Sequence, residues 1–140
     1  MDNYEAFKGF LDNEKFKYDE KQLGNGDWLV RIPQKIQNDA IVNVVFLLSK
    51  FKIKVAILGI ATSKEEEKKL ALYDLFNKFN MEYAFFKMYM RPDGGICVDA
   101  DFALEFIKGE FQPKELMRFA AMAMHSVGKY YPDIIKIQSA

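Results

Sequence analysis

Apolar residues recur along this chain at two spacings, one typical of helices and one typical of strands. The helical spacing predicts helices over residues 4–13, 63–80 and 113–130. Alternating or continuous apolar runs predict strands over residues 15–23, 28–33, 41–48, 52–60, 85–91 and 96–102. The element order is therefore α-β-β-β-β-α-β-β-α, which indicates an α+β architecture.

Glycine, proline and serine predict where several of these elements begin and end. Gly24-Asn25-Gly26 predicts a tight hairpin turn, because glycine accepts positive backbone angles. Pro33 has no N–H to donate and so marks an edge, a bulge or the end of its strand. Ser63 stands three positions before a glutamate, the spacing of a capping box, and predicts a helix start. Pro132 predicts that the last helix ends near Tyr130.

The second hairpin, around Pro92-Asp93-Gly94-Gly95, can be registered from its own pattern. A two-residue loop would place Met88 or Phe86 opposite the aspartates of the following strand. A three-residue loop over residues 93–95 leaves one face apolar and the other polar, and we prefer it because a one-residue slip inverts the faces. The pairs that it predicts are Met90 with Val98, Met88 with Ala100, and Lys87 with Asp101.

Three segments carry more apolar surface than a single buried face requires. Residues 41–48 are apolar on both faces apart from Asn43, which predicts a central strand covered on both sides or one whose second face meets a partner. The apolar arc of the last helix is about 200° wide, whereas a surface helix needs somewhat over 100°. Residues 85–90 are rich in Phe and Met, and Met is common on adaptable binding surfaces. The residues that we expect to contact a protein partner are Phe46, Leu48, Phe86, Met88, Met117, Met124 and Tyr131.

Composition and charge favour one soluble cytoplasmic domain over residues 1–140. The 20 basic and 20 acidic residues give a net charge of zero, which argues against nucleic acid or a membrane as partner. A single cysteine excludes a disulfide framework and a cysteine-based metal site. The acidic N-terminus has no signal-peptide core, and the longest apolar runs are of strand length.

The residues able to carry chemistry do not form a catalytic set, so we expect no catalytic residue, no cofactor and no metal. His125 is the only histidine and falls on the polar stripe of the last helix, where a solvated side chain is expected. Cys97 neighbours Asp99 on a strand, an environment that disfavours a thiolate. Asp99 and Asp101 have the spacing of a carboxylate pair, but pairing with Lys87 across the hairpin is the simpler role.

Three segments resemble the YbjN-like family of sensory-transduction regulators. They are residues 75–80 (Leu-Phe-Asn-Lys-Phe-Asn), residues 94–102 (Gly-Gly-Ile-Cys-Val-Asp-Ala-Asp-Phe) and residues 131–134 (Tyr-Pro-Asp-Ile). The element order is similar to that of the type III secretion chaperone-like fold, the group to which this family belongs. The resemblance implies helices packed on an antiparallel sheet of about five to six strands, and a second copy as partner. It carries no catalytic motif with it.

The leading hypothesis is therefore a non-enzymatic protein-binding module, chaperone-like or regulatory, that forms a homodimer and binds a protein or peptide client through exposed apolar surface. The alternative is a small-molecule-binding protein or enzyme with a pocket between sheet and helices, lined by Trp28, Phe86, Tyr89 and Tyr131. A nucleic-acid-binding regulator is the third hypothesis and fits the zero net charge least well.

Overall fold

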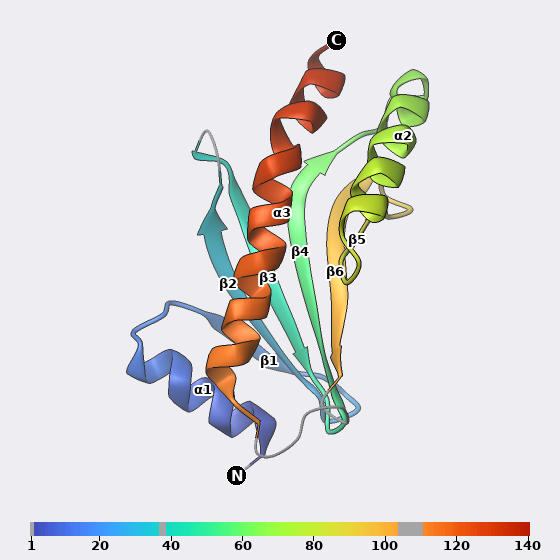
Figure 1. Ribbon diagram of the computed structural model, residues 1–140. Helices are drawn as coiled ribbons and strands as arrows, with labels where there is room; N and C mark the ends of the chain where they lie inside the picture. Colours follow the sequence, from blue (N-terminus) through green and yellow to red (C-terminus); the bar gives the residue numbers. More distant parts are fainter. Residues whose placement is uncertain (1, 37–38, 104–110) are drawn as a thin grey trace.

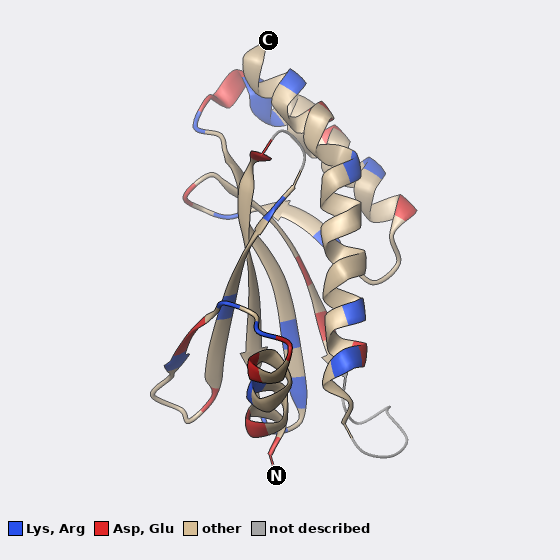
Figure 2. Cartoon of the chain, turned by 90° about the vertical axis from the view of Figure 1, so that its left-hand side faces the viewer, with Lys and Arg blue, Asp and Glu red and all other residues tan. Residues whose placement is uncertain are grey.

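Three helices cover one face of a six-stranded antiparallel sheet in the computed structural model, which describes residues 2–36, 39–103 and 111–140 (Figures 1 and 2). The strand order across the sheet is β1-β2-β3-β4-β6-β5. The predicted α+β class and element order are confirmed. The elements are α1 (Asn3–Asn13), β1 (Asp19–Gln22), β2 (Trp28–Lys35), β3 (Ile41–Leu48), β4 (Lys52–Thr62), α2 (Glu66–Glu82), β5 (Lys87–Met90), β6 (Gly95–Ala103) and α3 (Pro113–Ser139).

The core lies between the sheet and the helices, because alternate strand residues point toward the helical layer. Phe46 on β3 is fully buried, and its ring centroid lies 4.7 Å from that of Phe7 on α1. Small residues at Ala120 and Ala123 allow α3 to approach the sheet closely. The buried strand residues of this face are Val30, Ile32, Val42, Val44, Phe46, Leu48, Ile53, Val55, Ile57, Ile60, Met88, Ile96, Val98 and Ala100.

Helix α3 crosses the sheet between α1 and α2 (Figure 1), which accounts for much of its wide apolar arc. The prediction that it ends near Tyr130 is wrong, because the helix continues through Pro132 to Ser139. Two contacts of the last turns hold it. Ile134 is fully buried, and Gln138 donates a hydrogen bond of 2.8 Å to the Thr62 carbonyl. Tertiary packing thus outweighs the backbone hydrogen bond that Pro132 removes.

A ladder of aromatic rings joins α2 and α3. The Phe79 centroid lies 5.0 Å from that of Tyr130 and 4.7 Å from that of Tyr83. Beside these rings, Glu82 accepts hydrogen bonds from Lys129 at 2.7 Å and from the Tyr130 hydroxyl at 3.1 Å. The Lys129 ammonium lowers the pKa of Glu82. The two helices are therefore joined by apolar contact inside and by an ionic group outside.

Both hairpins use three-residue loops, but the predicted register of the second is wrong. The first loop, over residues 24–26, is confirmed and ends at Gly26 with φ 90°. The second loop is residues 92–94, because Arg91 donates to the Gly95 carbonyl at 2.8 Å. Pro92 has no N–H for a strand pair and Gly94 takes φ 87°, so the loop lies one residue earlier than predicted. The observed pairs are Met90 with Ile96, Met88 with Val98, and Lys87 with Asp99.

The positions of Pro33 and Ser63 follow from their backbone neighbours. Pro33 lies inside β2 but beyond the last residue that pairs with β1, where β2 has a free edge, so one of its three predicted roles is confirmed. The capping role predicted for Ser63 is wrong, because α2 begins at Glu66. The Ser63 N–H instead donates to the Gly94 carbonyl at 2.9 Å, which ties the end of β4 to the second hairpin.

Asn80 closes part of the outer edge of β5. Its side-chain oxygen accepts from the Met88 N–H at 2.8 Å, and its side-chain nitrogen donates to the Met88 carbonyl at 3.2 Å. The carboxamide thus makes the two hydrogen bonds that a further strand would make. An unpaired edge is a template for aggregation, so Asn80 both stabilises β5 and protects it.

Candidate interaction surface

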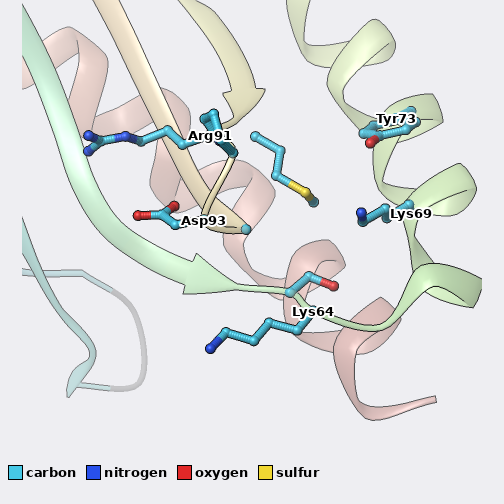
Figure 3. A pocket seen from close by; sticks show the side chains of 9 residues that line it. Lys64, Lys69, Tyr73, Arg91 and Asp93 are labelled. Carbon is cyan, nitrogen blue, oxygen red and sulfur yellow. The ribbon is translucent and has the colours of Figure 1, made fainter.

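One cavity, of about 520 Å³, lies between α2 and the second hairpin (Figure 3). Lys69 and Tyr73 border it from α2, while Arg91 and Asp93 border it from the hairpin side. The groups do not converge on one point: Lys69 pairs with Glu66 at 2.9 Å, and Asp93 accepts from the Gly95 N–H. Lys69 is therefore engaged with its own helix, and Asp93 with its own turn.

The aromatic residues expected to line a pocket between sheet and helices are not brought together. Phe86 is buried in the core, and Tyr131 packs against the core from α3. Trp28 stacks on Tyr4 with ring centroids 3.9 Å apart, at the α1 end of the molecule. Tyr89 lies on the opposite face of the sheet from the helices, because its neighbour Met88 points into the core.

The candidate reactive groups lie apart from one another. His125 is exposed on α3, on the polar stripe predicted for it. Cys97 is 1% exposed on β6, and burial raises the pKa of its thiol, so the thiolate is disfavoured. Asp99 accepts a hydrogen bond of 2.5 Å from the Tyr89 hydroxyl and lies 4.0 Å from the Lys54 ammonium. Lys87 stands opposite Asp99 and not opposite Asp101, a consequence of the corrected register.

The seven residues predicted to contact a partner divide into two groups. Phe46, Leu48, Phe86 and Met88 are at most 4% exposed and form part of the core between sheet and helices. These four side chains have almost no surface to offer a partner in the folded chain. The second group is partly buried and packs against the core from α3: Met117, Met124 and Tyr131.

The face of the sheet that points away from the helices carries an apolar centre. Sequence reasoning predicted a second apolar face for β3, and the neighbouring strands β2 and β4 extend it. Within the part of the chain that the structure describes, no helix covers this open face (Figure 2). We use the name apolar centre for its outward-pointing residues on β2, β3 and β4: Leu29, Val45, Leu47, Ala56 and Leu58.

Charged residues flank the apolar centre in a single row across the sheet. Arg31 lies opposite Asp19 and pairs with it, while Val45 and Ala56 occupy the middle of the row. The strand register places six residues side by side from β1 to β5, and we call them the charged row: Asp19, Arg31, Val45, Ala56, Asp99 and Lys87. The open face thus has an apolar middle and an ionic rim, the anatomy of a protein interface.

Other surface features do not point to a metal site or to a membrane. Among residues 2–36, 39–103 and 111–140, no group of three or more His, Cys, Asp or Glu side chains could hold a metal ion. In the same described residues, none of the helices is both long and apolar enough to cross a bilayer.

The fold defines a class of α+β proteins with helices on one face of an antiparallel sheet. Residues 3–136 match the model of the YbjN family, described as "Putative bacterial sensory transduction regulator", and the chain belongs to this family. A similar solved structure is "Crystal structure of YbjN, a putative transcription regulator from E. coli", with a TM-score of 0.68 and 13% identity over 97% of this chain and 93% of that one.

A second similar structure is that of an uncharacterized protein from Methanothermobacter thermautotrophicus. Its TM-score is 0.59 and its identity 13%, over 96% of each chain. No curated protein matches this sequence. At this identity the two structures establish a shared fold, while the family match extends over nearly the whole chain.

Proposed function

We propose that this protein is a non-enzymatic, protein-binding regulator that forms a homodimer through the open face of its sheet. The observation that carries the proposal is the apolar centre, whose five side chains lie on a sheet face without a covering helix in the described residues. Val45 is only 9% exposed and the other four side chains are half-buried, so the patch offers limited surface, but apolar surface on a sheet face without a covering helix usually marks an interface. The family description as a regulator supports a binding role over catalysis.

The overall charge is compatible with self-association. A net charge of zero provides no long-range repulsion between two copies. It also provides no general attraction to nucleic acid or to anionic lipid, so the proposal includes neither as partner. The protein is one cytoplasmic domain in this proposal, and a peptide or protein client binds outside the homodimer interface.

The test compares an aspartate placed in the apolar centre with one placed on a helix. Leu29→Asp puts a charge on the open face, and we expect it to abolish self-association measured by light scattering, because the carboxylate would have to be desolvated at the interface. Leu70→Asp is the matched control, since Leu70 is exposed on α2, far from that face.

Circular dichroism must show that both variants are folded before their masses are compared. Unchanged association of Leu29→Asp, or equal loss in both variants, would contradict the proposed surface. A wild-type protein of 16.3 kDa at every concentration would contradict the homodimer itself.

A further inference from the structure

The charged row has an order of signs that is complementary to its own reverse. Read from β1 to β5, it is negative, positive, neutral, neutral, negative, positive, from Asp19, Arg31, the apolar pair, Asp99 and Lys87. Read from β5 to β1, every charge has the opposite sign. A row with this property can pair with a second copy of itself only if the second copy runs in the reverse order.

We infer that two copies pack with their open faces together, related by a two-fold axis that runs parallel to the strands between β3 and β4. The inference rests on the proposed function and specifies how its homodimer is built. Such an axis keeps each row on the same row of the partner and reverses the order of strands across it. Arg31 then faces the partner's Asp99, Asp19 faces the partner's Lys87, and Val45 faces the partner's Ala56.

The other two-fold arrangement of the same faces is disfavoured by the charges. An axis perpendicular to the strands would place every strand over its own copy, so Arg31 would face the partner's Arg31 and Asp99 the partner's Asp99. Like charges at an interface oppose association, and the charged row would then select against this geometry. Both axes keep the strands of the two sheets aligned, with the sheets about 10 Å apart, so the charges alone distinguish the two arrangements.

The neighbouring row brings no like charges together under the parallel axis. It contains Lys21, Leu29, Leu47, Lys54 and Asp101 in order across the sheet. In the reversed order Lys54 lies over the partner's Leu47, and Asp101 lies over the partner's Leu29. The apolar stem of a lysine can cover a leucine while its ammonium remains in water.

A charge exchange between two variants tests this geometry. Arg31→Glu places a carboxylate opposite the partner's Asp99, and Asp99→Arg places a guanidinium opposite the partner's Arg31, so each variant alone has two repulsive contacts per dimer. We expect each to self-associate at least roughly tenfold more weakly than the wild type. A mixture of the two restores both opposite-charge contacts, so we expect an association near that of the wild type, with one copy of each variant.

The measurement is energy transfer between separately labelled variants, with sedimentation of each variant alone. Association of the mixture together with weak association of both single variants supports the inference. Single variants that associate like the wild type overturn it, and so does a mixture as weak as its components. In either case a dimeric wild type that Leu29→Asp dissociates leaves the proposed function standing.

A second pair of charge substitutions keeps the test valid if Arg31→Glu or Asp99→Arg fails to fold. Asp19 and Lys87 are both exposed, and Asp19→Lys mixed with Lys87→Glu follows the same logic. Agreement between the two pairs supports the parallel axis. If wild-type chains never associate, the proposed homodimer fails together with the inference, which separates that outcome from a wrong geometry.

Discussion

The edge protection by Asn80 gives the sharpest prediction for stability. Replacing Asn80 with alanine removes the bonds of 2.8 Å and 3.2 Å to the Met88 backbone. Met88 is only 1% exposed, so water has little access to the two groups left behind. Leaving a buried donor or acceptor unpaired costs ~1–3 kcal/mol, and alanine returns a few tenths through its higher helix propensity. Two such groups are left unpaired, so we expect a loss of about 2–5 kcal/mol, which lowers the melting temperature by roughly 7–18 °C.

Urea unfolding followed by circular dichroism measures this loss, and Asn77→Ala is the matched control. Asn77 lies less than one turn earlier on α2, with an exposed side chain. Asn80→Asp keeps an acceptor for the Met88 N–H but no donor for its carbonyl, so it should also destabilise. Amide exchange at Met88 should accelerate in Asn80→Ala. Equal stability of Asn80→Ala and Asn77→Ala would refute the reasoning.

Three further predictions concern other parts of the fold, and a fourth concerns pH. Gly94→Ala should cost at least about 2 kcal/mol in thermal or urea unfolding, because Gly94 has φ 87° and an added Cβ would lie 2.3 Å from the Ser63 carbonyl oxygen. By contrast, Gly9→Ala should stabilise by up to about 1 kcal/mol, since α1 leaves open space there; a loss of stability would count against that helix. Cys97 should react with a thiol reagent at neutral pH only after denaturant is added, because burial raises the pKa of its thiol; rapid labelling of the native protein would disprove this. Hydrogen bonding from Lys129 lowers the pKa of Glu82 in the folded protein. The stability that ionised Glu82 contributes is therefore present above its unfolded pKa and is lost as the pH falls through its folded pKa. Glu82→Gln should flatten the acid side of a plot of stability against pH, and an unchanged plot would contradict a stabilising role of the Glu82 carboxylate.

The order of elements could be predicted because hydrophobic periodicity is local. Residues 41–48 already indicate a central strand by being apolar on both faces, and the structure confirms it. The register of the second hairpin was missed by two residues, although the choice of faces was right. Pro92 indicates the correct register, since a residue without an N–H fits better in the loop than in a strand that must donate backbone hydrogen bonds.

The open face could be predicted only in part. The charged row unites residues from β1 to β5, and its existence depends on five strand pairings that no local pattern determines. The hydrogen bonding of Asn80 to the edge of β5 was not predicted either, because it depends on a strand that begins seven residues later. Likewise, Phe46 and Met88 are buried because the helices pack on their face of the sheet. Periodicity alone cannot show which apolar face of a strand is covered by helices.

The most direct test of the open face as a homodimer interface is a nuclear Overhauser measurement on a mixed sample. One half of the chains carries isotope label and the other half does not, so only contacts between two copies are observed. Our account predicts signals from the methyl groups of Val45 and Leu47, with Val45 close to the partner's Ala56. Signals confined to helix residues such as Leu70 and Met81, or no signal from a dimeric sample, would contradict it.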